Sequence, residues 1–192
     1  MGEESSRDAY KLLSGLIIPR PIGWIGTRRD DGTYNLAPFS FFNVVSVRPP
    51  SVMFSAGRHP DRPKDSVAFA QQTGEFTVNI VSEEVVEAMS VTSGSFESHH
   101  DEFEIAGLEA IEGTKVSAPL VAESPANLEC VVIDIIDIGG RTRVVIGEVV
   151  ALHVREDVLD GTRINMDALG AVGRLAGNSY IRTVDRFELT RP

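Results

Sequence analysis

Cysteine is nearly absent from this 192-residue sequence, in which Cys130 stands alone. A lone cysteine forms no disulfide within its chain and belongs to no C-x-x-C pair, which excludes a disulfide-rich scaffold and a zinc ribbon. Long hydrophobic runs are also absent, since none approaches the roughly 20 residues that cross a bilayer. The first 15 residues are polar where a signal peptide needs an apolar core. We therefore expect one cytoplasmic domain, residues 1–192, without membrane attachment.

Basic residues are scarce, with 18 Lys and Arg against 28 Asp and Glu and a net charge of −10. An acidic protein repels the phosphates of nucleic acids, so we expect no nucleic-acid partner. An anionic ligand needs a pocket in which the local charge is positive. The few places where Arg and Lys cluster are therefore the first candidates for such a pocket.

Several chemical signatures are missing as well. No G-x-G-x-x-G follows an expected strand, and neither a P-loop nor a G-x-S-x-G nucleophile motif is present. The His-His-Asp-Glu run at 99–102 has no matching ligand set elsewhere, so we expect no metal site. Cys130 lies in an apolar expected strand, where a thiol is inert. The sequence therefore predicts no catalytic side chain.

Short strands joined by tight turns dominate the pattern, with a few short helices between them. We expect strands at 21–28, from 34 onward, and at 51–56, 75–81, 128–138, 142–154 and 180–189. We expect helices at 5–13 with a stop at Gly15, from Asp61 and Pro63 to Gly74, from Ser82, and at about 167–175. The turns at 30–32 and 139–140 predict antiparallel neighbours. This order favours an antiparallel barrel over a doubly wound parallel sheet.

The densest candidate for a binding surface runs from Asn35 to Asn43. It contains Pro38 followed by Phe39, Ser40, Phe41 and Phe42. Flat apolar side chains beside exposed backbone groups suit a planar heteroaromatic ligand. The alternative, which composition alone favours, is a buried strand whose phenylalanines belong to the core.

A second candidate spans residues 58–66, where Arg58, Arg62 and Lys64 surround an expected helix start. The unpaired N–H groups of a helix start can hold a phosphate, and the Ser66 hydroxyl adds a donor. The alternative is that the acidic residues and Ser66 cap the helix while the basic side chains are solvated. An aromatic surface and an anion site in one domain suggest a phosphorylated aromatic cofactor.

A third candidate lies near the C-terminus. Gly173 and Gly177 permit close approach there, and Arg174, Tyr180 and Arg182 supply two guanidinium groups and a phenol. The alternative is the C-terminal turn of a helix, whose negative dipole end favours cationic residues. The residue types leave both interpretations open.

Short segments in a fixed order run through most of the chain. They are Pro19-Arg20-Pro21-Ile22 through Trp24 to Thr27, Asn35 to Phe42, Pro49-Pro50, Lys64-Asp65-Ser66, Gly74-Glu75-Phe76 through Asn79, Glu102-Phe103, Leu128-Glu129-Cys130, Gly147-Glu148-Val149, and Gly173-Arg174 to Arg182. In these segments, from about Leu12 to its end, the chain resembles the flavin reductase-like, FMN-binding split-barrel family. The resemblance implies a mainly β, Greek-key antiparallel split barrel with a few short peripheral helices. It also implies a homodimer with FMN at or near the subunit interface.

The resemblance assigns FMN contacts by position. The segment along the isoalloxazine ring corresponds to Asn35, Pro38, Phe39, Ser40, Phe41 and Phe42. The phosphate-binding stretch corresponds to Ser55, Arg58, Lys64 and Ser66. A C-terminal motif that approaches the flavin, in its own or the partner subunit, corresponds to Arg174, Tyr180 and Arg182.

In function, the resemblance implies an FMN-dependent oxidoreductase in which NAD(P)H reduces the flavin, and the flavin reduces a second acceptor or a redox partner protein. Ser66 stands where Thr is common in the family, which keeps the hydroxyl, and Arg48 replaces a common acid. Residues 142–144 (Thr, Arg, Val) occupy the neighbourhood where some members carry a nicotinamide-binding His. The alternative is therefore a non-enzymatic FMN-binding electron carrier reduced by a protein partner. A third possibility is a barrel that has lost FMN and serves as an interaction module.

Overall fold

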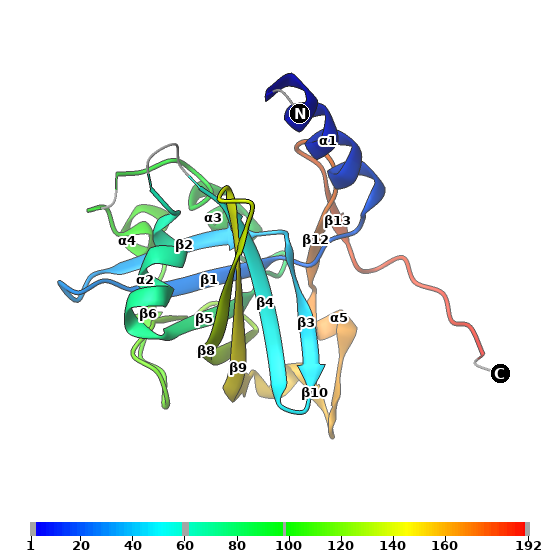
Figure 1. The fold of residues 1–192 in the computed structure, drawn as a ribbon. Coiled ribbons are helices and arrows are strands. Elements are labelled where there is room, and N and C mark those ends of the chain that lie inside the picture. The colour runs from blue at the N-terminus through cyan, green and yellow to red at the C-terminus, as the bar shows by residue number, and fades with distance from the viewer. Residues whose placement is uncertain (1–2, 59–61, 98, 191–192) are drawn as a thin grey trace.

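The computed structural model describes residues 3–58, 62–97 and 99–190, and Figure 1 shows their arrangement. At its centre is a seven-stranded sheet in the order β2-β1-β5-β8-β9-β4-β3, in which every neighbouring pair is antiparallel. The strands are β1 (Gly23–Arg28), β2 (Tyr34–Phe39), β3 (Phe42–Val47), β4 (Pro50–Gly57), β5 (Glu75–Ile80), β8 (Ala126–Ile138) and β9 (Thr142–Val154). The mainly β, antiparallel class predicted from the sequence is confirmed.

Small sheets and short helices surround this sheet. The small sheets pair β6 (Ala110–Ile111) with β7 (Leu120–Val121), β10 (Leu159–Asp160) with β11 (Arg163–Ile164), and β12 (Val172–Arg174) with β13 (Tyr180–Arg182). The helices are α1 (Glu3–Leu16), α2 (Asp65–Thr73), α3 (Val86–Val91), α4 (Glu102–Ala106), the 3-10 turn η1 (Glu156–Val158) and α5 (Met166–Leu169). None of the helices in the described part of the chain has the length and apolar character that spanning a membrane requires.

The longest strands, β8 and β9, form the ribbon that the glycine pair at 139–140 predicts. Gly139 and Gly140 have φ values of 61° and 70°, which residues with a side chain rarely adopt. β9 also pairs with β4, so that Ala56 lies opposite Arg143 and Gly57 opposite Thr142. The end of β4 therefore lies beside the turn of the ribbon, a position that becomes important for the site.

Two clusters of buried side chains form the core. Phe54 and Phe76 lie in one cluster, and Trp24 lies in the other. The backbone approaches the first cluster closely at Gly147, where a Cβ atom would lie 2.4 Å from the Phe76 ring. Cys130 is fully buried in the same cluster, and burial raises the pKa of its thiol to about 12. A thiol that stays protonated is inert, as its position in the sequence predicts.

The loop between β6 and β7 is tied to the sheet by a buried carboxylate. Glu129 on β8 accepts hydrogen bonds from the backbone N–H groups of Thr114, Lys115 and Val116, at 2.8, 2.6 and 2.7 Å. Nε2 of His153 lies 2.6 Å from Oε1 of Glu129. Burial alone would raise the pKa of Glu129, but these donors outweigh it and lower the pKa to about 2. The carboxylate therefore stays ionised and anchors the loop.

The start of α2 differs from the sequence prediction. A helix start at Asp61 or Pro63 is predicted, but Asp61 lies outside the described residues and α2 begins at Asp65. Pro63 instead forms an isolated β-bridge with Arg58, which keeps its backbone extended. The helix ends, as predicted, at Gly74, whose φ is 73°.

Two predicted helices are displaced or shortened because their segments pair with each other. The Glu83 N–H donates to the Gly170 carbonyl at 3.0 Å, so the helix predicted from Ser82 begins only at Val86. Gly170 adopts a φ of 54° and ends α5, so the helix predicted at 167–175 spans four residues. The strand predicted at 180–189 likewise ends at Arg182. In the two predicted helices, pairing between distant segments overrides the local helix signals.

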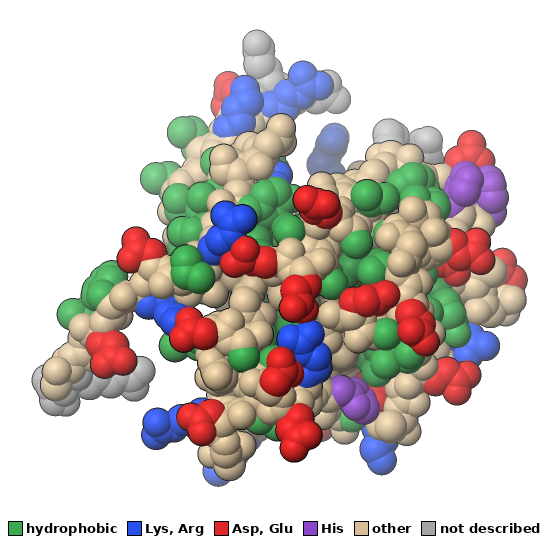
Figure 2. Space-filling model, turned by 180° about the vertical axis from the view of Figure 1, so that it is seen from behind, with side chains coloured by type: hydrophobic (Ala, Val, Ile, Leu, Met, Phe, Trp, Pro, Cys, Tyr) green, Lys and Arg blue, Asp and Glu red, His purple; other side chains and the backbone are tan. Residues whose placement is uncertain are grey.

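Helix α1 and the two residues that follow it carry an exposed hydrophobic surface, which we call the α1 apolar surface. It consists of Tyr10, Leu12, Leu13, Leu16, Ile17 and Ile18. Leu16 is 77% exposed and Leu12 is 66% exposed. Figure 2 shows hydrophobic side chains gathered at this end of the molecule. A contiguous exposed hydrophobic surface of this kind is typical of an interaction site.

Candidate functional site

A polar pocket of about 110 Å³ opens at the start of α2. It is lined by Asn35, Ala37, Pro38, Phe39, Lys64, Asp65, Ser66, Thr92, Ser93, Gly94, Ser95, Phe96 and Glu102. Strand β2, the first turn of α2, the chain that follows α3, and α4 each contribute one side. The fold thus brings five of the residues predicted for a ligand, at positions 35, 38, 39, 64 and 66, to one cavity.

Hydrogen bonds fix the buried floor of this pocket. Nδ2 of Asn35 donates to Oγ of Ser66 at 2.9 Å and to Oγ1 of Thr27 at 3.2 Å. Asn35 and Ser66 are both almost completely buried. Because Ser66 Oγ accepts from Asn35, its own hydrogen is left for another acceptor, and none of the described residues supplies one. The arrangement presents a hydroxyl donor whose position is set by two neighbouring elements.

The first turn of α2 adds further donors to the same side. Lys64 is the N-cap residue, in an extended conformation, and its side chain does not cap the helix. The N–H groups of a first helical turn have no partner within the helix, and the helix dipole makes this end positive. With the Lys64 ammonium group and the Ser66 hydroxyl beside it, this helix start can bind a phosphate group.

Glu102 closes the opposite wall. Its Oε2 atom accepts the Leu36 N–H at 3.1 Å and lies 3.7 Å from Nη2 of Arg29. Burial raises the pKa of Glu102, although the Leu36 hydrogen bond and the Arg29 charge oppose the rise. The Arg29 side chain is itself buried and donates to Thr33 and to the His100 carbonyl. The wall therefore holds a carboxyl group whose charged form is disfavoured by burial.

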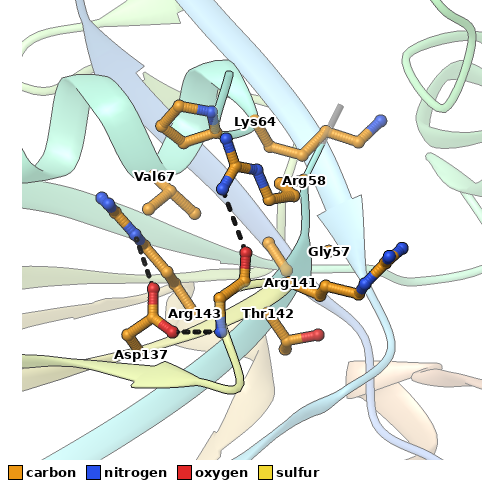
Figure 3. A pocket seen from close by; sticks show the side chains of 11 residues that line it. Gly57, Arg58, Lys64, Val67, Asp137, Arg141, Thr142 and Arg143 are labelled. Atoms are coloured by element: carbon orange, nitrogen blue, oxygen red, sulfur yellow. Dashed lines mark hydrogen bonds and ion pairs between the residues drawn. The ribbon is translucent and has the colours of Figure 1, made fainter. Parts of the chain in front are cut away.

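A second, smaller cavity lies beside the first, and we call it the basic pocket (Figure 3). Its volume is about 30 Å³, and its lining includes Arg58, Lys64, Arg141, Arg143 and Asp137. Nη1 of Arg58 donates to the Gly140 carbonyl at 3.0 Å, which joins the end of β4 to the β8–β9 turn. Lys64 lines both cavities. The pocket meets the requirement for local positive charge in an acidic protein.

The three phenylalanines of the aromatic run face three different surroundings. Phe39 lines the polar pocket and packs on Phe54, with ring centroids 5.1 Å apart. Phe41 is 42% exposed and lies 6.4 Å from the Tyr10 ring of α1. Phe42 packs tightly against Gly23, where a Cβ atom would lie 2.6 Å from its ring. The run therefore forms no single flat surface within one chain, and contacts of Phe41 and Phe42 with a flavin stay a prediction.

Ser55 does not line either cavity among the residues described. Its N–H donates to the Phe41 carbonyl at 2.7 Å, which ties β4 to the aromatic run. Ser40 lies in the same run and accepts a hydrogen bond from Nε of Arg20 at 3.3 Å. Both serines thus hold the 38–42 segment in place.

Arg20 connects that segment to the end of α1 and to Leu175, the residue after β12. Its side chain is buried and donates to the carbonyls of Ser14, Ile17 and Leu175, the last two at 2.9 Å. Two of these carbonyls lie at the C-terminal end of α1, where carbonyl groups lack helical partners. This capping accounts for the helix continuing through Gly15 to Leu16, where the sequence predicts a stop.

The C-terminal candidates gather on the β12–β13 hairpin. The Arg174 guanidinium lies 4.5 Å above the Tyr180 ring and donates to the Gly177 carbonyl. Arg182 donates to Glu83 at 2.6 Å. Tyr180 and Arg182 line a separate cavity of about 250 Å³ rather than the polar pocket. Their place near a flavin therefore stays a prediction.

The chain that forms this polar pocket is similar to known proteins. A family model described as "Flavin reductase like domain" matches residues 14–170. The chain belongs to this family. An uncharacterized protein of Halalkalibacterium halodurans is 41% identical, over 98% of this chain and 93% of its own length.

Solved structures of the flavin reductase-like fold agree with this membership. Nitrilotriacetate monooxygenase component B from Bacillus cereus is 35% identical, with a TM-score of 0.94 over 98% of this chain and 97% of its own. A Shewanella frigidimarina protein described with a split barrel domain is 23% identical, with a TM-score of 0.87 over 97% and 93%. The predicted family and split-barrel fold are confirmed, and the family links this chain with flavin-related oxidoreductases.

Several residues that line the two cavities are not predicted from the sequence. The wall formed by Thr92, Ser93, Gly94, Ser95 and Phe96 follows a short helix, and its Ser and Gly content was the one available signal. Arg141 and Arg143 lie more than 70 residues after Lys64 and join it only through the β4–β9 pairing. Glu102 belongs to a segment that the resemblance matches, but nothing in the sequence shows that its carboxyl group is buried.

Proposed function

We propose that this chain is an FMN-binding oxidoreductase of the NAD(P)H:flavin reductase type, which passes electrons from a nicotinamide through FMN to a second acceptor. The observation that carries the proposal is the polar pocket, where Ser66, Lys64 and the first turn of α2 converge beside Asn35. These donors match a phosphate monoester, and membership of the flavin reductase-like family supports a flavin as its carrier.

The protein's own part in this function is binding and orientation. Lys64 and Ser66 would hold the phosphate, while the 38–42 segment, kept in place by Arg20 and Ser55, would lie along the ring. When bound, FMN would supply the ability to accept a hydride and pass electrons onward. No proton-transferring residue of the chain is required, and none is proposed.

We further propose a homodimer in which the α1 apolar surface is covered by a second copy. Six hydrophobic residues of this surface are exposed in the single chain, which is unfavourable in water. In such a dimer Arg174, Tyr180 and Arg182 of one subunit could approach the flavin of the other. A size measurement that finds only monomer with FMN bound would remove this part of the proposal.

The alternative function is an FMN-binding electron carrier that a protein partner reduces. The observation that favours it lies at residues 142–144, where some family members carry a nicotinamide-binding His. Arg143 here is engaged with Gln71 at 2.6 Å and with Asp137 at 3.9 Å. Anaerobic reduction separates the two functions, because a reductase loses its oxidised-flavin band on addition of NADH or NADPH and a carrier keeps it.

Phosphate binding is tested by titrating the double variant Lys64→Ala, Ser66→Ala with FMN and with riboflavin. Loss of a charged contact costs about 1.5–3 kcal/mol, so FMN affinity should fall by roughly 10- to 150-fold. Riboflavin has no phosphate, and its affinity should stay the same. Lys115→Ala, which removes an exposed charge of the β6–β7 loop, is the control. Unchanged FMN affinity would show that the phosphate is bound elsewhere, and no binding to the unaltered protein would favour a barrel without FMN.

A further inference from the structure

Glu102 has no role in the proposed binding of FMN, although it forms one wall of the polar pocket. Its side chain is only 9% exposed, and a buried carboxyl group needs hydrogen-bond donors to offset its loss of water. Oε2 has such partners, because it accepts the Leu36 N–H at 3.1 Å and lies 3.7 Å from Nη2 of Arg29. No other residue in the described part of the chain donates to Oε1. One oxygen of a buried carboxyl group is thus left for a ligand.

The surroundings of Glu102 fix its position. Glu102 is the first residue of α4, and Asp101 caps this helix by accepting the Phe103 N–H at 2.9 Å. The hydrogen bond from Leu36 joins the carboxyl group to β2, and the buried Arg29 side chain lies on the same oxygen. A side chain that is already held in place loses little conformational freedom when a ligand binds to it.

The polar pocket presents donors on one side and an acceptor on the other. Ser66 and Lys64 donate from the start of α2, whereas the Glu102 carboxyl group lies on the side of α4. On the adjoining chain, the Thr92 hydroxyl uses its hydrogen for the Met89 carbonyl at 2.9 Å. A phosphate dianion only accepts hydrogen bonds, so it satisfies the donor side and is repelled by an ionised carboxylate. The side of the pocket at Glu102 therefore favours a ligand group that can donate.

A hydroxyl group is the ligand group that suits Glu102 best. Burial raises the pKa of Glu102, although the Leu36 N–H opposes the rise. A hydroxyl group can donate to an ionised carboxylate and can accept from a protonated carboxyl group, whereas an N–H group can only donate. A ligand that carries hydroxyl groups therefore pairs with Glu102 in both of its charge states.

FMN carries hydroxyl groups in its ribityl chain, which joins the ring to the phosphate. In the proposed function the phosphate lies at Ser66 and the ring lies along the 38–42 segment. Pro38 and Phe39 of that segment line the same cavity as Ser66 and Glu102, and the cavity of about 110 Å³ has room for several water-sized groups. The chain between the ring and the phosphate is therefore expected to pass through the polar pocket, beside Glu102.

We propose that Glu102 binds the ribityl chain, with its Oε1 atom accepting a hydrogen bond from a ribityl hydroxyl group, and that this contact selects flavins that carry the chain. The inference rests on the proposed function, since it takes the phosphate to lie at Ser66 and the ring to lie along the 38–42 segment. Glu102 then determines specificity on the side of the pocket that the phosphate does not reach.

The test measures the affinities of riboflavin, FMN and lumiflavin for the full chain and for Glu102→Gln. Riboflavin has the ribityl chain without the phosphate, and lumiflavin has a methyl group in place of the chain. Replacement of the carboxylate by a neutral amide should lower riboflavin affinity about fivefold, since hydrogen bonds to charged groups are the stronger ones. FMN affinity should fall less, because the same change removes a negative charge near the phosphate. Lumiflavin affinity should not change. Competition with FMN measures the two weaker ligands.

Two further variants complete the test. Glu104→Gln removes an exposed charge from the same helix and controls for the change in net charge. Glu102→Ala removes the acceptor altogether, so riboflavin affinity should fall further than in Glu102→Gln. Urea denaturation shows whether Glu102→Ala is folded, and if it is not, Glu102→Gln alone decides the test.

Three results would overturn the inference. Riboflavin affinity that does not fall in Glu102→Gln would show that the carboxyl group does not contact the ribityl chain. An equal loss for lumiflavin would show that Glu102 acts on the ring or through the fold, and an equal loss in Glu104→Gln would show an effect of overall charge. If the unaltered chain binds none of the three flavins, the proposed function fails and the inference with it. Binding of FMN and riboflavin that Glu102→Gln leaves unchanged refutes only the inference.

Discussion

Glu129 and Glu102 are both buried carboxylates, yet the two regions around them shift their pKa values in opposite directions. Glu129, under the β6–β7 loop, has its pKa lowered to about 2, whereas burial raises the pKa of Glu102 in the wall of the polar pocket. Thr114, Lys115, Val116 and His153 surround the first carboxylate, and Thr114 donates through both its N–H and its hydroxyl. Glu102 receives one backbone N–H and has Arg29 at 3.7 Å.

The number of hydrogen-bond donors, and not depth of burial alone, decides whether a buried carboxylate is stable as an ion. Around Glu129 the donors compensate fully for lost water, and the charge stabilises the fold. Around Glu102 the compensation is partial. Substitutions can alter the two regions one at a time.

The largest effect is expected for Glu129→Gln. The pKa of Glu129 falls from 4.5 in the unfolded chain to about 2 in the folded one, which corresponds to about 3 kcal/mol of stability. A lowered carboxylate pKa stabilises above pH 4.5, and this contribution is lost as the pH falls toward 2. The variant should lose most of it at pH 7 and show a flatter acid response in urea denaturation.

The control for this substitution is Glu112→Gln, an exposed glutamate close to the same loop. Its free energy of unfolding should change by less than about 0.5 kcal/mol. Equal losses of unfolding free energy in the two variants would mean that the hydrogen bonds to Glu129 do not stabilise the fold.

A smaller effect is expected for Gly113→Ala, which acts on the same region from the loop side. The new Cβ atom would lie 2.4 Å from Oε2 of Glu129, and the carboxylate cannot give way because its donors hold it. Overpacking of this kind costs roughly 1–3 kcal/mol, measured as a lower denaturation midpoint. Gly57→Ala is the matched control, since its Cβ atom meets nothing within 4 Å. If both alanines are tolerated alike, the loop is not held as tightly as the contacts imply.

The smallest effect is expected for Glu102→Gln. The amide oxygen can still accept the Leu36 N–H, and Arg29 keeps its bonds to Thr33 and His100, so the loss at pH 4 should be about 1 kcal/mol. A raised carboxyl pKa makes the folded protein less stable as the pH rises above 4.5, and the variant should lose this dependence. Denaturation at pH 4, 6 and 8 measures the slope. A loss as large as that of Glu129→Gln would contradict the comparison.

The sequence predicts the sheet well because its signals are local. The alternation of apolar and polar residue types at 75–80, the glycine pair at 139–140 and the Asp-Gly turn at 31–32 each predict a strand or a hairpin from local sequence. Helix starts are predicted less well, because Ser82 and Pro63 engage partners far along the chain or in a neighbouring strand. Propensity cannot anticipate such pairing.

The residues of the candidate site also fall into two groups, those that local sequence predicts and those that only the fold brings together. Asn35, Lys64 and Ser66 lie in recognisable segments and do meet in one pocket. The divergence of Phe39, Phe41 and Phe42 follows from the bend between β2 and β3, which no residue type announces. The pairing of β4 with β9 brings Arg141 to the basic pocket, so its position there depends on topology alone.

Arg20 links the N-terminal helix, which lies at the surface, to the 38–42 segment beside the pocket. Its guanidinium group is shared among the end of α1, the residue after β12 and the 38–42 segment. Removing residues 1–17 would take away the Ser14 and Ile17 carbonyls and expose a cation that the fold now shields. The wall of the pocket would then lose a support it receives from outside the barrel, so shortening the protein at its N-terminus is a change to the site itself.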